Sequence, residues 1–526
     1  MVQASELDID EGASALEMAN AIFGDGVSVI GASYTGDNRS SGIFSGGDDT
    51  SPGVVPSDTG VILSTGRVRD FTNNNGDANQ SNSTSTNTQG QNNNADFNAV
   101  AGRSTYDAAY MDVDFTTTGD TMTMQFVFAS DEYPEYVNSI YNDVFAVWIN
   151  GTYVPLEVGN GDTAVTEINQ ADTENLYVDN TQSQFNTEMD GFTVTMTLTI
   201  PVIPTTDPNN PVVNSIRIGI ADASDSSYDS SVLIAGDSVQ TAMVAIADDV
   251  TIGTNFTKTI DVLANDQINP SPNFEITHIN GNEIQPNQSI TLATGQTITL
   301  NSDWTIDVQT TGDTGEVAFT YTIEDNGITD TAFVTLDTIP CFVAGTAILT
   351  PEGERPVETL SVGDMVMTHD NGPQEIRWIG SRTLVAQGKH APIAIRAGAL
   401  GDHRTLLVSP HHRILIRDLL SELLFGEPEV LVSAKDLVND RSIRPREGGE
   451  VTYVHMLFDQ HEIVFSEGLA TESFLPGPQT ADCFEQAVLD EICDIFPELD
   501  PNTGEGYSPA ARRTLRAYEA RLLMSA

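Results

Sequence analysis

The sequence predicts a mainly β protein with two β-sandwich domains, a further all-β domain and a short helical tail at the C-terminus. Short runs of β-branched or aromatic residues recur between Gly, Asn, Asp and Pro, as in "TMTMQFVFAS" and "GFTVTMTLTIP". Apolar residues at helical spacing are confined to a stretch near the N-terminus and to the tail. The predicted boundaries are 1–244 and 245–338 for the sandwiches, 339–480 for the third domain and 481–526 for the tail.

Charge density also changes at the start of the third domain. Residues 1–340 contain 6 Lys and Arg against 48 Asp and Glu, a net charge of -42, whereas residues 341–526 contain 16 against 28, a net of -12. So acidic a front half repels nucleic acid and anionic membrane surfaces. Its carboxylates either serve solubility alone or bind a hard cation such as calcium, and the composition favours neither reading.

Cysteine usage restricts the class of protein. Cys341, Cys483 and Cys493 are the three cysteines, so no disulfide can cross-link residues 1–340. Cys483 and Cys493 lack a CxxC pair and nearby paired histidines, which argues against zinc, and a disulfide between them stays open. The start "MVQASELDIDEG" is acidic and no run of 18 apolar residues exists, so we expect no cleavable Sec signal and no transmembrane segment.

Two regions are predicted to be helical. Over residues 11–23, Leu16, Ala19 and Ile22 share one helical face and Gly24 is the expected C-cap. In the tail, "CFEQAVLDEICDIF" has helical spacing, and a second helix is expected to begin with Ser508 as N-cap and Pro509 at the first helical position. The apolar residues of the tail are expected to cover the core of the third domain.

A polar stretch, "TNNNGDANQSNSTSTNTQGQNNN", interrupts the first sandwich at residues 72–94. Nothing in it is more apolar than Ala78, so it cannot bury enough surface to offset the entropy of ordering. We therefore predict a disordered, mobile surface loop.

The first domain contains "GVSVIGASYTGDNRSSGIFSGG", "GVILSTG", "FASDEYPEYVNSIYNDVFAVWING" and "IGIADASDSSYDSSVLIAGD" in this order within residues 20–240. These segments resemble the choice-of-anchor L family, domains of bacterial surface and secreted proteins. The resemblance implies a β-sandwich exposed outside the cell and identifies no ligand.

Carboxylates of this domain gather in turn-like stretches after predicted strands. "DASDSSYD" places aspartates at i, i+3 and i+7, which converge if the loop curls, and calcium accepts irregular cages of oxygen atoms. The alternative is that aspartate caps turns here. The predicted calcium ligands are Asp131, Glu132, Asp143, Asp222, Asp225 and Asp229, with Asp248, Asp249 and Asp266 as weaker candidates.

The second domain has strand–turn–strand spacing and ends in an alternating stretch, "GEVAFTYTIEDNGITDTAFVTL". Its "IDVLAND" is similar to cadherin-like or Ig-like modules of large bacterial adhesins. Because the module occurs once, we interpret it as a spacer or presentation module.

The third domain opens with "CF-x-x-GT", continues with "TPEGERPVETLSVGDMVMT" and "LLVSPHHRILI", and closes with "YVHMLFDQHEIVFSEGLATESFLPG". These elements resemble the Hint superfamily of hedgehog/intein self-processing domains, most closely its bacterial branch. The implied fold is an all-β horseshoe that brings its two ends together.

The junction residues suit an N-to-S acyl shift. A thiolate at Cys341 can attack the carbonyl of Pro340 and convert the peptide bond into a thioester. Because a free thiol titrates near pH ~8.5, a base or a positive neighbour is expected. The departing amide nitrogen must gain a proton, a task that suits a histidine.

By the resemblance, His412 matches the histidine of the Hint T-x-x-H element, with Ser409 in place of threonine. His461 is the second catalytic candidate, and a surface strand histidine is the equally weighted alternative. The remaining assignments are Asp364 and Asp459 as residues that could orient an imidazole, His411 as structural, and no role for His369, His390, His403 and His455.

Three departures from the resembling families narrow the function. No His-Asn pair exists, so splicing is not expected, and no acidic residue lies between Glu375 and Asp402 to activate a sterol. Pro340 replaces the glycine of hedgehog-type junctions. An n→π* contact from the carbonyl of Ile339 makes the prolyl thioester a slower electrophile.

Two functions follow. The first is an exported bacterial surface or extracellular adhesin-like protein whose Hint domain cleaves or transfers residues 1–340 once per molecule, to water or to an unknown acceptor nucleophile, without a required cofactor. The alternative is a non-cleaving extracellular binding protein with an inactive Hint domain, which Pro340 and Ser409 favour. A conventional hydrolase lacks a G-x-S-x-G element or a paired-carboxylate motif.

Overall fold

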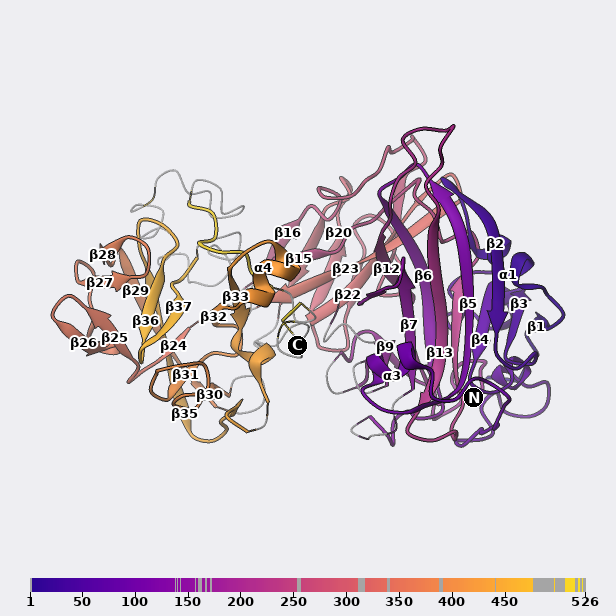
Figure 1. The fold of residues 1–526 in the computed structure, drawn as a ribbon, viewed down its shortest axis with the longest axis horizontal. Helices are drawn as coiled ribbons and strands as arrows, with labels where there is room; N and C mark the ends of the chain where they lie inside the picture. The colour runs from indigo at the N-terminus through magenta and orange to yellow at the C-terminus, as the bar shows by residue number, and fades with distance from the viewer. Residues whose placement is uncertain are drawn as a thin grey trace. The chain divides into compact units, whose positions relative to one another are not determined.

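A computed structural model confirms the mainly β class (Figure 1). It describes residues 2–137, 139, 141, 143–156, 158, 163–165, 168–170, 173–252, 257–310, 317–337, 341–386, 391–439, 441–475, 496, 507–515, 519–520 and 523. The chain forms two compact units. The first consists of Met1–Asp248, Ile260–Asp307 and Ala318–Thr335, and the second of Asp249–Thr259, Val308–Val317 and Leu336–Ala526.

The N-terminal domain is a sandwich of two antiparallel sheets. One sheet runs β1 (Asp8–Asp10), β3 (Ser41–Ser45), β4 (Gly60–Ser64), β14 (Ser230–Ala235), β6 (Thr121–Ser130), β11 (Gly191–Thr193) and β10 (Tyr177–Asp179), with β12 (Met196–Pro201) also on β6. The other runs β2 (Val27–Thr35), β5 (Thr105–Thr117), β13 (Asn214–Ala223), β7 (Val144–Ile149) and β8 (Thr152–Val154), with β9 (Thr163–Ala164) on β7.

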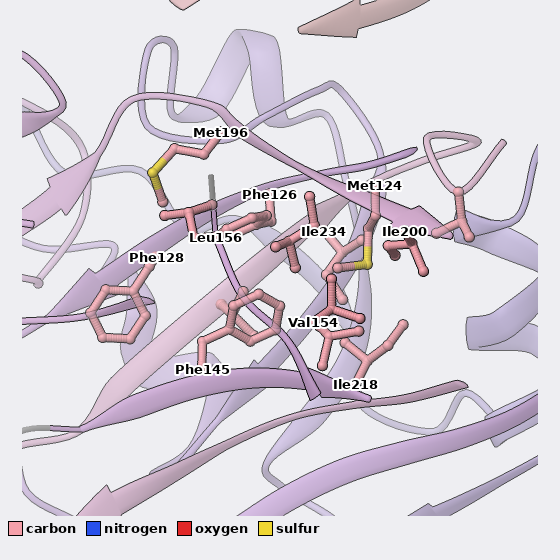
Figure 2. Packing of buried hydrophobic residues seen from close by; sticks show 14 of the residues in the cluster. Met124, Phe126, Phe128, Phe145, Val154, Leu156, Met196, Ile200, Ile218 and Ile234 are labelled. Carbon is pink, nitrogen blue, oxygen red and sulfur yellow. The ribbon is translucent and has the colours of Figure 1, made fainter. Parts of the chain in front are cut away.

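Strand β6 shows why these residues form a buried strand. Met124, Phe126 and Phe128 alternate along it and point into the main core, where Phe126 packs against Phe145 at 4.7 Å between ring centroids (Figure 2). Val127, on the opposite face, enters a second apolar cluster. Each fully buried aromatic or aliphatic side chain contributes roughly 1.5–3 kcal/mol, so a strand buried on both faces anchors the sandwich.

Two of the short helices of this domain, α1 (Ala15–Ile22) and α3 (Ala95–Ala101), begin at side-chain caps. Helix α1 starts with a capping box between Ser14 and Glu17, which confirms the predicted N-terminal helix. Its buried face consists of Met18, Ala19 and Ile22, whereas Leu16, which we expected there, is 46% exposed. The C-cap is Phe23 rather than Gly24. The others are α2 (Gly47–Thr50) and η1 (Val68–Phe71).

The predicted disordered loop is corrected by its hydrogen bonds. Residues 72–94 form no helix or extended strand, but the backbone amides of residues 80–89, here called the strap, donate to carboxylates of other segments. The pairs are Gln80 to Glu188, Thr84 to Asp131, Thr86 to Asp229, Thr88 to Asp107 and Gln89 to Asp37, at 2.7–3.1 Å. The prediction took only apolar burial into account. Hydrogen bonds to these distant carboxylates hold the strap in place without requiring apolar burial.

The second domain is also a sandwich, as predicted. Its sheets run β15 (Asp248–Thr251), β23 (Ile328–Asp337), β22 (Val317–Asp325), β17 (Glu275–Ile279) and β18 (Asn282–Glu283), and β16 (Thr257–Ile260), β21 (Ile306–Gln309), β20 (Thr297–Leu300) and β19 (Ser289–Thr291). The buried Tyr321 hydroxyl donates to the carbonyl of Val262 at 2.8 Å.

The third domain contains two further sheets. One runs β29 (Trp378–Val385), β35 (Glu450–Leu457), β24 (Phe342–Val343), β31 (Leu406–Val408), β30 (Ile393–Ile395) and β34 (Ile443–Pro445). The other runs β26 (Gly353–Pro356), β25 (Ala347–Thr350), β36 (Ile463–Ser466), β37 (Leu469–Glu472), β32 (Arg413–Arg417) and β33 (Glu429–Ser433). Strand β27 (Met365–Thr368) joins β36 and β28 (Gly372–Glu375). Its short helices are η2 (Val357–Thr359), α4 (Leu419–Phe425) and η4 (Ala434–Leu437).

The tail is only partly as predicted. Leu515, Ala520 and Leu523 are buried in the core of the third domain, which confirms that the tail covers it. The helix expected from Ser508 is wrong, because residues 508–515 are irregular apart from a bridge between Thr514 and Leu431. The Ser508 hydroxyl accepts the amide of His461 instead of capping its own segment. The predicted helix around Cys483 and Cys493 lies outside the described residues.

Candidate functional site

Strand register brings three distant residues into one row at the start of the third domain. Phe342 on β24 is aligned with Val408 on β31 and with Val454 on β35. Both pairings are antiparallel, so Cys341, one residue earlier, is flanked by the next residues of those strands, Ser409 and His455. Residues 68 and 114 positions away in sequence therefore flank the cysteine.

Ser409 holds the backbone of Cys341 from one side. The Cys341 amide donates to Ser409 Oγ at 2.8 Å, and the Ser409 amide donates to the Cys341 carbonyl at 3.0 Å. This amide nitrogen belongs to the predicted scissile peptide bond. The predicted hydroxyl contact is therefore present, although serine replaces the threonine of the related motif. Pro340 lies outside the described residues.

His455 contacts the thiol from the other side, and sequence reasoning assigned it no role. Its Nε2 lies 3.4 Å from Cys341 Sγ, and both residues are buried. Around the thiol, Val343, Ala386, Val451 and Tyr453 form a small apolar cluster. Apolar surroundings disfavour a thiolate, so the imidazole is the polar group able to assist its formation. The signal that identifies His455 is its register with Cys341, which the sequence alone does not provide.

His412 is almost completely buried, and its ring packs edge-on against Phe342 at 4.4 Å. Neither ring nitrogen has a hydrogen-bond partner among the described residues. Burial lowers the pKa of His412 to about 4, although the nearby Glu472 opposes the shift. An imidazole with two unpaired nitrogens is costly inside a protein.

His461 is buried too, but protein groups engage both of its ring nitrogens. Nδ1 accepts the Ala511 amide at 2.9 Å, and Nε2 lies 3.2 Å from the Ser473 carbonyl and 3.5 Å from Glu472 Oε2. No ring nitrogen is left for a reacting peptide. These contacts do not support the catalytic role predicted for His461 and give it a place in the attachment of the tail.

Glu472, which sequence reasoning did not single out, is completely buried beside these histidines. Its carboxylate accepts the Arg413 amide at 2.9 Å and pairs with the Arg413 guanidinium at 3.2 Å. Burial alone would raise the pKa of Glu472, but Arg413 and His461 hold it at about 2. The site therefore contains a permanent negative charge next to His412.

The other assigned residues lie in ordinary contacts. Asp364 pairs with Arg355 at 3.1 Å and Asp459 with Arg377 at 3.3 Å, so the structure places both predicted orienting carboxylates in ion pairs. His411 is buried. His403 accepts the amide of Leu400, His369 contacts Asp370, and His390 lies outside the described residues.

Five of the six predicted calcium ligands are buried, and Asp225 is half-buried. Several accept protein hydrogen bonds, but Asp222 Oδ1 and Asp229 Oδ2 have no hydrogen-bond partner among the described residues. Asp143 accepts the Ala223 amide and the Ser230 hydroxyl, and Glu132 accepts the Asp143 amide. Asp225 accepts the amide of Ser227 in a turn. Within the described ranges, no three His, Cys, Asp or Glu side chains are arranged to hold a metal ion. Calcium stays a prediction.

Burial without cations changes the protonation of this acidic cluster. It raises the pKa of Asp131 and Glu132 to about 8 and that of Asp229 to about 7. The pKa values of Asp143 and Asp222 rise further, because neighbouring carboxylates add to the effect of burial. Among the weaker candidates, Asp266 accepts the Ile246 amide and the Tyr321 hydroxyl.

Three family models match consecutive parts of the chain. A choice-of-anchor L domain matches residues 8–240, a bacterial Ig domain matches residues 240–337 and a Hint domain matches residues 340–478. A search of curated proteins gives no match. Among the described residues, no helix is long and apolar enough to cross a membrane.

Solved structures similar to parts of the chain include two of the intein type. The MchDnaB-1 intein is 12% identical, covers 25% of this chain and 98% of its own, and has a TM-score of 0.18. A bacterial intein-like domain from Clostridium thermocellum is 15% identical, covers 25% and 97%, and has a TM-score of 0.19. Extracellular domains 3–5 of Drosophila OTK are 8% identical, cover 64% and 85%, and have a TM-score of 0.17.

Proposed function

We propose that this chain, a choice-of-anchor L domain, a bacterial Ig domain and a Hint domain in series, is a cell-surface or secreted protein that cleaves itself between Pro340 and Cys341. The observation that carries the proposal is the row His455–Cys341–Ser409. In this row a thiol at the first residue of the Hint domain contacts an imidazole, while the scissile amide is held by a hydroxyl.

The first step is an acyl shift that needs no co-reactant. His455 Nε2 accepts the proton of the Cys341 thiol, and the thiolate attacks the Pro340 carbonyl. The new C–S bond replaces the C–N bond, and the nitrogen of Cys341 leaves with one added proton. His455 gains the thiol proton, and the amine gains a proton from His412, which must first take one up from solvent. Once His455 returns its proton to solvent, the step is an isomerisation.

His412 is the group that delivers the proton to the leaving nitrogen. Its neighbour Phe342 follows the reacting residue directly, and its ring nitrogens have no competing partner among the described residues. Because burial lowers the pKa of His412 to about 4, its protonated form is a strong acid and gives up the proton readily. Ser409 keeps the amide oriented while this transfer takes place.

In the second step, water or another nucleophile attacks the thioester. The Pro340 acyl group leaves with that nucleophile, and the Cys341 thiolate is released and regains a proton. With water, the product is residues 1–340 with a free carboxylate, so each molecule reacts once. Which nucleophile resolves the thioester decides whether the anchor and Ig domains are released or attached to a partner.

The purified chain tests the proposal when its cleavage is followed with and without dithiothreitol. We expect two fragments that together account for the 56.5 kDa chain, and none from Cys341→Ala. His455→Ala should slow cleavage by about 10²-fold or more, the range of a lost general base. His278→Ala, in the second domain where the ring contacts Thr277, is the control and should cleave at the parent rate. An uncleaved parent chain would instead favour the non-cleaving binding protein.

A further inference from the structure

The part of the tail formed by residues 507–515, here called the clasp, is docked on the Hint domain by backbone and side-chain contacts. The Tyr507 hydroxyl donates to the Phe458 carbonyl at 2.6 Å. Leu431 on β33 donates its amide to the Arg513 carbonyl and accepts the Leu515 amide, both at 2.8 Å. The clasp therefore extends a sheet of the domain.

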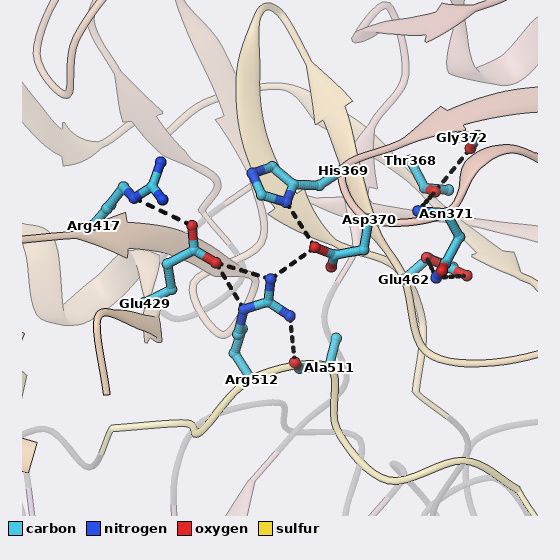
Figure 3. Close-up of polar contacts among 10 residues, drawn as sticks. All are labelled: Thr368, His369, Asp370, Asn371, Gly372, Arg417, Glu429, Glu462, Ala511 and Arg512. Atoms are coloured by element: carbon cyan, nitrogen blue, oxygen red, sulfur yellow. Dashed lines mark hydrogen bonds and ion pairs between the residues drawn. The ribbon is translucent and has the colours of Figure 1, made fainter. Parts of the chain in front are cut away.

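Arg512 fixes the centre of the clasp by bridging two carboxylates (Figure 3). Its guanidinium lies 2.8 Å from both Asp370, in the turn between β27 and β28, and Glu429, on β33. Hydrogen bonds between charged groups are shorter and stronger than those between neutral groups. The clasp thus ties two parts of the domain together directly beside Ala511.

The clasp determines the protonation of His461. The Ala511 amide can only donate, so His461 Nδ1, at 2.9 Å, must present a lone pair. The nitrogen that donates is then Nε2, which faces the Ser473 carbonyl and Glu472. The His461 amide also donates to Ser508 Oγ at 2.7 Å, so the clasp holds this residue at two points.

Glu472 links His461 to the reaction site. The same carboxylate that His461 Nε2 approaches accepts the Arg413 amide at 2.9 Å, and Arg413 follows His412 directly. Its negative charge also acts on the His412 imidazole. Three contacts therefore connect the clasp to the backbone beside His412: Ala511 to His461, His461 to Glu472, and Glu472 to the Arg413 amide.

We propose that docking of the clasp activates cleavage, with His461 and Glu472 as positioning residues that transmit it to His412. This inference rests on the proposed self-cleavage and adds its regulation. A chain in which residues 507–515 are undocked keeps residues 1–340 attached. Cleavage then follows the folding of the whole Hint domain. An incomplete domain, which could misdirect the thioester, stays unreactive.

Matched proline variants of the full chain provide the test. Ala511→Pro removes the N–H that His461 accepts, whereas Ala510→Pro makes the same change at the exposed preceding residue. We expect Ala511→Pro to slow hydroxylamine cleavage by about tenfold to a hundredfold, the cost of a slightly misplaced catalytic group. Ala510→Pro should react at the parent rate. Glu472→Gln, which keeps the acceptor for the Arg413 amide and removes the charge, should also slow cleavage.

A second readout does not depend on cleavage. In the Cys341→Ala chain, ring ¹⁵N NMR should find His461 as the Nε2–H tautomer, and Ala511→Pro should convert it to a mixture. Suppose that the His461 tautomer changes but both Ala511→Pro and Glu472→Gln cleave at the parent rate. This result would refute activation by the clasp and would leave the proposed self-cleavage intact. An unchanged tautomer overturns the clasp contact itself. A parent chain that never cleaves, with the tautomer change present, removes the proposed function and its regulation but not the contact. If Ala511→Pro fails to fold, the rate of Glu472→Gln decides alone.

Discussion

Buried carboxylates occur in both halves of the molecule, and their pKa values are shifted in opposite directions. In the anchor domain, Asp143 and Asp222 are buried among other acids, and burial together with those acids raises their pKa values. In the Hint domain, Glu472 is just as buried, but Arg413 and His461 lower its pKa to about 2. The pKa values of the first group are therefore raised, whereas that of Glu472 is lowered.

The difference follows from the supply of cations. Residues 1–340 contain 6 Lys and Arg for 48 acids, so buried carboxylates there rely on backbone amides and protons. Residues 341–526 contain 16 for 28, enough to pair a buried acid. Burial depth alone does not determine whether a carboxylate is charged, because the partner decides. A charged Glu472 can act on His412, whereas in the anchor domain a buried carboxylate such as Asp143 accepts hydrogen bonds from an amide and a hydroxyl.

Removing the cation should turn Glu472 into an unpaired buried acid. Arg413→Met leaves this carboxylate without its guanidinium, and losing one partner of a buried pair costs about 3–5 kcal/mol. We expect the free energy of unfolding of the Hint domain to fall by that amount in denaturant titrations followed by the fluorescence of its Trp378. Arg417→Met, whose surface pair with Glu429 is 3.4 Å long, is the control and should cost less than about 1 kcal/mol. Equal losses of stability in Arg413→Met and Arg417→Met would contradict the prediction that Glu472 depends on its buried cation.

Acid should destabilise the Hint domain. The folded pKa of His412 is lowered to about 4, so the unfolded chain binds more protons between pH 6.5 and 4. This contribution is complete above pH 6.5 and is lost as the pH falls to 4, about 3 kcal/mol in total. Because the pKa of Glu472 is also lowered, its contribution is lost further down, between pH 4.5 and about 2. In His412→Gln, the melting temperature of the Hint domain should no longer fall between pH 6.5 and 4. The fall at lower pH, which comes from Glu472, should remain.

Base should destabilise the anchor domain. The folded pKa of Asp229 is raised to about 7, so the folded state holds a proton that the unfolded state releases near pH 4, and stability declines from pH 4 to 7. Asp229→Asn keeps an acceptor for the Thr86 amide and should raise the free energy of unfolding at pH 9 by about 2 kcal/mol, with little gain at pH 4. The exposed Asp120→Asn is the control. A gain that is the same at both pH values would contradict the assignment.

The smallest expected effect concerns the strap. Thr86→Pro removes the N–H that Asp229 accepts and should lower the stability of the anchor domain by about 1–2 kcal/mol. Asn82→Pro, at a strap residue that makes no hydrogen bond among the described contacts, is the control and should cost less. Chemical denaturation at pH 6 compares them, and equal losses would mean that the strap carboxylates contribute nothing specific.

The sequence predicted those features of the fold and site that depend on the order of residues along the chain. The β class, the three domain types and the position of Cys341 at the junction all come from motifs and composition. The contact of Ser409 with the scissile amide follows from its place in a short motif. Local chemistry sufficed in each case, because the informative residues are neighbours in sequence.

Features that depend on distant partners could not be predicted in this way. His455 and His461 lie six residues apart in one motif. Sheet register puts His455 beside the thiol, whereas His461 lies between strands and contacts the tail. The polar segment 72–94 looked disordered because its acceptors, such as Asp131, lie far along the chain. Ser508 was expected to cap a helix, but an amide 47 residues away uses its hydroxyl.

The most direct test of self-cleavage is the intact mass of the purified chain after incubation with hydroxylamine. The account predicts an N-terminal fragment that ends at Pro340 as a hydroxamate and a C-terminal fragment that begins with Cys341. Neither should form in Cys341→Ala. A chain that keeps its full mass throughout, or breaks at any other bond, would contradict it.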